Sequence, residues 1–110
     1  MDTRLLTGML ETIILEILAP GPSYGYEICQ TAQHRSNGLF ELKEGSLYPA
    51  LHRLERQKLL SSYWEVAENR RRKYYKLTAA GQKALAARRR EWENFAAGVN
   101  GILGGAHGMA

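Results

Sequence analysis

The stretch from Glu44 to Leu60 constrains the fold most, because its two faces need different surroundings. At about 100° per residue, one stripe of a helix over this stretch is apolar and must pack against a core; it consists of Leu47, Ala50, Leu51 and Leu54. The opposite face mixes cations, an imidazole, an aromatic ring and a hydroxyl, which suit phosphates and base edges; it consists of Ser46, Tyr48, Pro49, His52, Arg53 and Arg56. Pro49 fits the first turn of a helix that Ser46 or Glu44 caps.

Chain length and charge narrow the class of protein. A chain of 110 residues with 45% hydrophobic content forms one small domain with a thin core. The net charge is +4, and every charged residue from Arg70 to Arg90 is Lys or Arg, which favours a polyanionic partner. The single cysteine, Cys29, excludes an intramolecular disulfide and fits a cytoplasmic protein. Glu11 and Glu16 interrupt the apolar N-terminal segment, so we expect neither a signal peptide nor a membrane span.

The segment from Thr3 to Leu18 has helical periodicity, but its apolar residues cover more than one stripe. Such a helix needs two neighbours, so one side can pack in its own domain and the other against a second subunit. The alternative is a central core helix of a monomer. The residues assigned to a dimer interface are Leu6, Met9, Leu10 and Ile13.

Ser23 is the expected N-cap of a second helix from Tyr24 to His34. Gly25 within it suggests close approach of another backbone or of a ligand, because glycine costs about 1 kcal/mol relative to alanine in a helix. A turn at residues 36–38 follows, after which Leu39 and Phe40 should re-enter the core.

After Leu60 the apolar period changes from helical spacing to alternation. We expect strands over Ser61–Val66 and Arg72–Leu77, joined by residues 67–71, as a hairpin. Its tip carries successive cations, which either protect a sheet edge from aggregation or contact phosphates or a minor groove; they are Arg70, Arg71, Arg72 and Lys73. Because no acid compensates them from Arg70 onward, we favour DNA contact.

Thr78 should cap a last helix from Ala79 to Val99. A short heptad-like seam runs along it, formed by Leu85, Trp92, Phe95, Val99 and Ile102. The seam can clasp the first helix of a partner subunit, with Leu85, Trp92, Phe95 and Val99 at the interface, or pack within the monomer. Trp92 and Phe95 from two subunits can also line an apolar slot at the dimer centre for a small hydrophobic or aromatic effector, or simply pack. We expect the glycine-rich tail after Gly98 to fray.

Helix, helix-turn-helix, basic hairpin and long helix together predict a mainly α fold with a small β-hairpin: a winged helix-turn-helix domain with a C-terminal dimerisation helix. Residues 1–77 would form the DNA-binding domain, residues 78–103 the dimerisation helix and residues 104–110 a disordered tail. Three stretches closely resemble signature motifs of PadR-like transcriptional regulators of the short subfamily; these are Ser23–Glu27, Glu44–Glu55 and Arg72–Gly81.

The resemblance implies a bacterial homodimeric repressor that binds a roughly palindromic operator on double-stranded DNA. It also implies that Tyr24, Ser46, Tyr48, Pro49, His52 and Arg53 approach the duplex with the wing cations. One departure is Lys58, which stands where the family usually has the glycine that ends the recognition helix. Because only one long helix and a glycine-rich tail follow the hairpin, we also expect the larger C-terminal effector domain to be missing, as in the short subfamily.

Two other classes of function compete with DNA binding. A winged helix can use its exposed face on a partner protein, without sequence-specific DNA binding. An enzyme is disfavoured, because the histidines are scattered, no glycine-rich phosphate loop is present and Ser23 and Ser46 are explained as caps. No metal or cofactor is expected.

Overall fold

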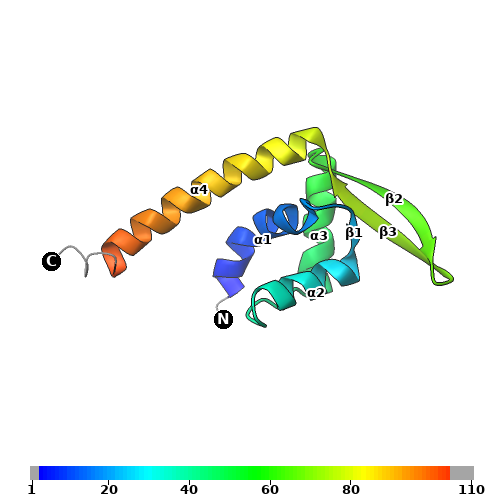
Figure 1. Cartoon of the computed structure of the whole chain (residues 1–110), viewed down its shortest axis with the longest axis horizontal. Helices are drawn as coiled ribbons and strands as arrows, with labels where there is room; N and C mark the ends of the chain where they lie inside the picture. The colour runs from blue at the N-terminus through cyan, green and yellow to red at the C-terminus, as the bar shows by residue number, and fades with distance from the viewer. Residues whose placement is uncertain (1–2, 105–110) are drawn as a thin grey trace.

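The computed structural model describes residues 3–104. Within them, four helices surround a core and a small antiparallel sheet extends from it (Figure 1). The helices are α1 (Thr3–Leu18), α2 (Gly25–Arg35), α3 (Glu44–Arg56) and α4 (Ala79–Leu103), and the strands are β1 (Ser23–Tyr24), β2 (Leu60–Ala67) and β3 (Arg70–Leu77). The predicted winged helix-turn-helix architecture is therefore confirmed.

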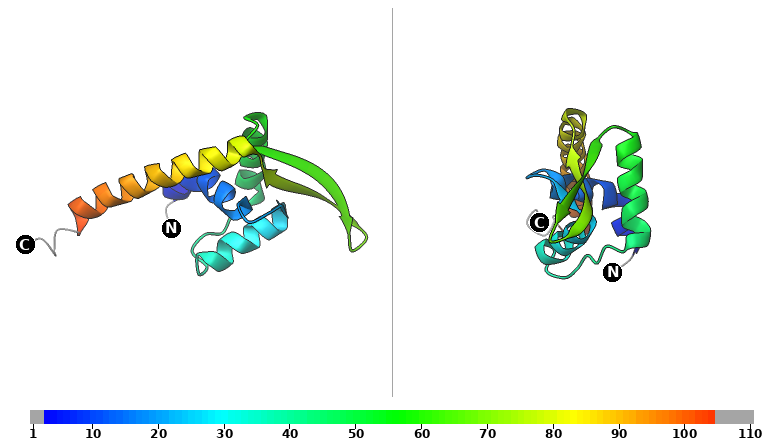
Figure 2. Two further views of the ribbon diagram at one scale, coloured as in Figure 1. Left: turned by 45° about the horizontal axis from the view of Figure 1, so that its top comes forward. Right: turned by 90° about the vertical axis from the view of Figure 1, so that its right-hand side faces the viewer.

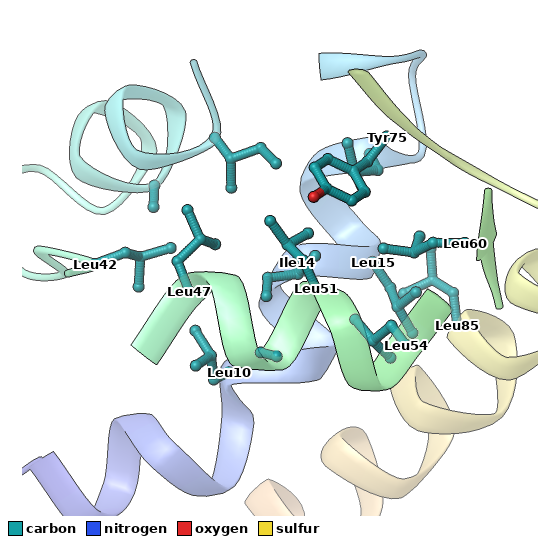
Figure 3. Close-up of a cluster of buried hydrophobic side chains, with 14 residues drawn as sticks. Leu10, Ile14, Leu15, Leu42, Leu47, Leu51, Leu54, Leu60, Tyr75 and Leu85 are labelled. Carbon is teal, nitrogen blue, oxygen red and sulfur yellow. The ribbon is translucent and has the colours of Figure 1, made fainter. Parts of the chain in front are cut away.

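The core forms where α1 crosses α3 and the base of the sheet (Figure 3). The predicted apolar stripe of α3 is fully buried, and Ile14 and Leu15 of α1 meet it. Tyr75 of β3 is 1% exposed and closes one side of the cluster. Because α2, α3, α4 and β3 all contact α1, this helix is the centre of the monomer. The two-sided apolar pattern of α1 is thus largely satisfied within one chain.

The hairpin differs from its predicted outline. Strands β2 and β3 pair from Leu60↔Leu77 to Ala67↔Arg70, so the connection is the two residues Glu68 and Asn69. Both have positive φ, 54° and 62°, as a tight turn with a twist matched to the strands requires. The predicted five-residue connection is wrong: the tip lies beyond the core, so no apolar alternation marks the strand ends there.

A third strand, β1, was absent from the predicted elements. Ser23 pairs with Tyr75 and Tyr24 with Tyr74, giving the sheet order β1-β3-β2. Two residues are too short to show a period. Ser23 is therefore in a strand and is not the N-cap of α2; its hydroxyl donates to Oε1 of Glu27 at 3.1 Å. Tyr24 occupies the cap position, and its backbone N–H lies 3.4 Å from the same carboxylate.

Helix α3 begins earlier than either predicted cap allows, because Lys43 is its N-cap. Pro49 is then the sixth helical residue, in the second turn rather than the first. The missing N–H leaves the carbonyl of Gly45 without its usual intrahelical donor. This carbonyl belongs to an exposed residue, so solvent or a ligand can bind it. Before the helix, Leu42 is buried, whereas the predicted core residue Leu39 is 59% exposed.

The end of α3 shows how the chain accommodates Lys58 at the position where a glycine is usual. Lys58 has φ 64°, so it adopts the left-handed conformation that glycine favours. The N–H of Leu59 donates to the Leu54 carbonyl at 3.0 Å and that of Lys58 to the Glu55 carbonyl at 2.9 Å, the two bonds of a Schellman motif. The lysine thus keeps the glycine-type ending at a conformational cost.

Helix α4 is capped as predicted: Oγ1 of Thr78 accepts from the N–H of Gly81 at 3.0 Å. The helix runs to Leu103, so Gly98 and Gly101 lie inside it, and the expected fraying from Gly98 is wrong up to that point. The rest of the predicted tail, residues 105–110, lies outside the described residues. Helix α4 and the hairpin project in opposite directions from the helical body (Figures 1 and 2), which gives extents of 61 × 29 × 21 Å.

Candidate nucleic-acid interface

The outward ridge of α3 is narrower than the sequence suggested. The buried stripe fixes the rotation of the helix, and four exposed residues lie within about 30° of the opposite direction; they are Gly45, Pro49, His52 and Arg56. Helix α3 lies at the edge of the molecule in the right-hand view of Figure 2, where a duplex groove can reach it. Ser46, Tyr48 and Arg53 instead occupy the flanks of the ridge.

Gly45 is the ridge residue that the sequence reasoning missed. A Cβ built on it meets nothing within 4 Å, so packing inside the monomer gives no reason for a glycine. Its place on the same helical stripe as Pro49 and His52 was the available signal. With Pro49, it leaves the start of α3 free of bulky side chains and lets another molecule approach the backbone closely.

Arg53 is bound within the protein. Its Nε donates to Oε2 of Glu11 on α1 at 3.0 Å. The other oxygen, Oε1, accepts from both terminal nitrogens of Arg88 on α4, at 3.3 Å each. Arg53 is still 46% exposed, so it can also contact a ligand at the rim of the ridge.

Tyr48 explains the glycine in α2. A Cβ on Gly25 would lie 2.2 Å from Oη of Tyr48 and 2.8 Å from its Cζ. The close approach predicted at Gly25 is real, but a side chain makes it, not a backbone or a ligand. Burial, followed by the nearby Glu44 carboxylate, raises the pKa of the Tyr48 hydroxyl. Its ring thus joins the starts of α2 and α3 and keeps one exposed edge.

The wing cations divide into two pairs. Arg70 and Arg71 are exposed at the tip, and Arg71 stacks on Trp64 with its Cζ 4.4 Å from the ring centroid. Arg72 lies between Glu68, at 3.5 Å, and the Tyr24 ring, at 4.5 Å from its centroid. Lys73 pairs with Glu55 of α3 at 3.8 Å. The expectation that no acid compensates these cations is wrong for Arg72 and Lys73, because the turn and α3 supply carboxylates.

Tyr24 belongs to an aromatic cluster on the outer face of the sheet. Its ring meets Tyr74 edge to face at 5.3 Å, and Tyr74 stacks on Tyr63 at 5.6 Å. With Arg72 above Tyr24, this cluster fixes the wing to the start of α2. Tyr24 therefore orients a wing cation, whatever contact its own hydroxyl makes.

The predicted dimer residues fall into two groups. Leu10 and Leu85 are 5% and 4% exposed in the monomer core, so their assignment to an interface is wrong. The physical reason is that the first half of α4 folds back on α1. Leu6, Met9, Ile13 and Val99 are half-buried, and Trp92 and Phe95 are exposed.

The apolar seam of α4 continues past the part of the helix that packs within the monomer. Phe95, Ile102 and Leu103 are exposed, with Ile102 at 85%. The rings of Trp92 and Phe95 lie 6.1 Å apart. Trp92, Met9 and Ile13 line an open groove of about 510 Å³ among α1, α2 and α4, but Phe95 does not. The expected effector slot joins these rings from two subunits, so it stays a prediction.

Among residues 3–104, no group of three His, Cys, Asp or Glu side chains could hold a metal ion. No helix in this range is long and apolar enough to cross a bilayer. Arg89 of α4 donates from Nε and a terminal nitrogen to Glu16 of α1, at 2.7 and 2.6 Å.

Comparison with known proteins points to one family. Residues 14–87 match the model of the transcriptional regulator PadR-like family. The structure is similar to that of a transcriptional regulator from Clostridium thermocellum, with 36% identity, a TM-score of 0.85 and coverage of 91% of this chain and 98% of that one. A PadR family transcription regulator from Clostridium difficile gives 38% identity and a TM-score of 0.76 over 88% of this chain and all of that one. Transcriptional regulator Rv3488 of Mycobacterium tuberculosis is 42% identical over 69 residues, 63% of this chain and 64% of that protein.

Proposed function

The chain belongs to the PadR-like family of transcriptional regulators, and from this premise we propose that it acts as a homodimeric repressor of a palindromic operator. Regulators of this family bind DNA. The observation that carries the proposal is the exposed ridge of α3. The apolar stripe on the opposite side of the helix is buried, so the rotation of α3 is fixed with the ridge facing outward. A helix of this kind enters the major groove while a wing follows the adjacent backbone.

Within this proposal, His52 and Arg56 read base edges, and Gly45 and Pro49 let the start of α3 approach the duplex. Ser46, Tyr48 and Arg53 contact the phosphates that flank the groove. Arg70 and Arg71 at the wing tip bind phosphate or a minor groove. Arg72, Lys73 and Tyr24 hold the wing in position, because their charges and rings already have partners within the chain.

The test begins with selection of bound sequences from a random duplex pool, followed by titration of the selected duplex and a scrambled one. Arg56→Ala should weaken the selected duplex by about 5- to 100-fold and the scrambled one much less. Arg71→Gln should weaken both equally and reduce the salt slope by about one. Arg90→Gln, which removes an exposed cation on α4, is the matched control. If wild-type protein binds both duplexes equally, sequence-specific recognition is refuted and the protein-interaction alternative is favoured.

Dimerisation is proposed from the exposed apolar residues in the C-terminal half of α4. The helix is about 37 Å long, and its C-terminal half extends beyond the helical body (Figure 1). Exposed apolar side chains at a seam spacing are stabilised when a second copy covers them. Trp92, Phe95 and Val99 would then meet Leu6, Met9 or Ile13 of the partner.

Phe95→Ser should raise the dimer dissociation constant without destabilising the monomer, because Phe95 is 64% exposed. Asn94→Ser is the control on the adjacent exposed position. Sedimentation velocity at low micromolar concentration measures the difference. A monomeric wild-type protein, or equal sedimentation of both variants and wild type, would contradict the interface.

Release by a small planar ligand is part of the same proposal. Two copies would bring the Trp92 and Phe95 pairs together, and the groove beside Trp92 offers apolar walls. Planar aromatic compounds should quench tryptophan fluorescence in the wild type and lower operator affinity. Trp92→Leu should abolish the second effect; release that persists in this variant would exclude the site.

A further inference from the structure

One carboxylate joins the proposed DNA-binding helix to the proposed dimerisation helix. Glu11 of α1 binds Arg53 of α3 with one oxygen and Arg88 of α4 with the other. The carboxylate is 24% exposed, and Arg88 is 28% exposed. Arg88 and Glu11 are 77 residues apart in sequence, so only the fold brings these charges together.

A second ion pair joins α1 and α4, but it does not extend to α3. The Nε and one terminal nitrogen of Arg89 donate to the Glu16 carboxylate at 2.7 and 2.6 Å. Among the described residues, neither of these two makes a hydrogen bond or ion pair with a side chain of α3. Two adjacent arginines therefore make the same kind of tie between the same two helices, and only Arg88 shares its carboxylate with α3.

The charges predict a consequence for phosphate binding. Arg53 with Glu11 alone is a neutral pair, whereas Arg53, Glu11 and Arg88 together carry a net charge of +1. A phosphate at Arg53 must compete with Glu11, and Arg88 weakens that competition because it occupies the second oxygen. Displacement of Arg88 would leave the whole carboxylate charge on Arg53.

We propose that Glu11 is a positioning residue through which the placement of α4 sets the affinity of Arg53 for DNA phosphate. When α4 holds Arg88 on Glu11, Arg53 is available to the duplex; when α4 moves away, Glu11 sequesters Arg53. This inference rests on the proposed DNA-binding function. It extends that function by naming a contact through which a change at the dimer helix reaches α3.

The test compares four single variants on the selected duplex: Glu11→Gln, Arg88→Gln, Glu16→Gln and Arg89→Gln. Arg88→Gln should lower affinity by about twofold to fivefold more than Arg89→Gln, within the range for exposed ion pairs. Glu11→Gln should raise affinity and steepen the salt slope relative to Glu16→Gln. Each comparison has the same charge change and the same loss of an α1–α4 tie, so generic electrostatics and helix loosening cancel.

The double variant supplies the decisive readout. With Glu11→Gln in place, Arg88→Gln should weaken binding no more than Arg89→Gln does, because the shared carboxylate is gone. Equal losses for Arg88→Gln and Arg89→Gln in the wild-type background, with the wild type binding normally, would overturn the relay alone. Absence of specific binding by the wild type would overturn the proposed function and the relay with it. Circular dichroism and sedimentation of every variant verify folding and assembly.

Discussion

Gly81 at the start of α4 is the position where the structure makes its sharpest stability prediction. A Cβ there would lie 2.1 Å from the carbonyl oxygen of Leu59 and 3.1 Å from its carbonyl carbon. Both atoms belong to the backbone just after the left-handed Lys58, so roughly 1 Å of movement must come from the chain itself. The same carbonyl accepts hydrogen bonds from the N–H of Thr78 at 3.1 Å and its Oγ1 at 3.2 Å.

Gly81→Ala should therefore destabilise the protein by about 1–3 kcal/mol, the usual cost of overpacking. At about 4–8 °C per kcal/mol for a small domain, a loss of about 2 kcal/mol lowers Tm by roughly 8–16 °C. The matched control is Gly98→Ala in the same helix, where a Cβ meets nothing within 4 Å. This control should gain about 0.5–1 kcal/mol from helix propensity.

Chemical denaturation monitored by circular dichroism measures both variants. Equal stabilisation by the two substitutions would refute the argument, because it would mean that helix propensity alone decides and that α4 does not pack on the Leu59 backbone. A change in the slope m for Gly81→Ala alone would indicate an altered denatured state rather than a clash.

The end of α3, the cap of α4 and Tyr48 near the start of α3 give three further predictions. Lys58→Gly should raise the free energy of unfolding by about 0.5–1 kcal/mol, because glycine relieves the left-handed strain at an exposed position, and a higher urea midpoint at unchanged m checks it. Thr78→Ala should cost about 1–2 kcal/mol, since it removes the α4 cap and the 2.7 Å bond to the Lys58 carbonyl, whereas Thr78→Ser should cost much less. The raised pKa of Tyr48 adds stability that is full below about pH 10 and is lost as pH rises through the folded-state pKa, so Tyr48→Phe should flatten the fall in Tm above that pH.

The helices could be predicted well because the signals for each one lie within its own segment of the sequence. The buried stripe of α3 and the Thr78 cap of α4 follow from spacing and side-chain type within one turn or two. The ending at Lys58 did not follow, because a lysine at that position fits either a strained left-handed ending or a different one, and only the structure shows the left-handed one. Strand β1 and the N-cap of α2 did not follow, since Ser23 fits both a cap and a strand until β3 is beside it.

The candidate interface was harder to predict because its selectivity depends on partners that are distant in sequence. A helical wheel places Arg53 on a polar face, but only the fold puts Glu11, 42 residues away, against its Nε. The wing cations follow the same logic: Lys73 is neutralised by Glu55 of α3, and Arg72 by the turn residue Glu68. Counting cations along the sequence therefore overestimates the charge that the wing offers to a duplex.

This charge pairing also limits which residues can confer specificity. An arginine whose guanidinium is held by a carboxylate loses part of its attraction for phosphate, and it keeps a fixed direction that a free side chain lacks. Arg56, His52 and Arg70 are exposed and can adapt to a duplex, whereas Arg53 and Arg72 arrive already oriented by carboxylates. The protein thus offers two kinds of cation to DNA, and only the oriented kind can transmit a change from α4, because only Arg53 shares its carboxylate with that helix.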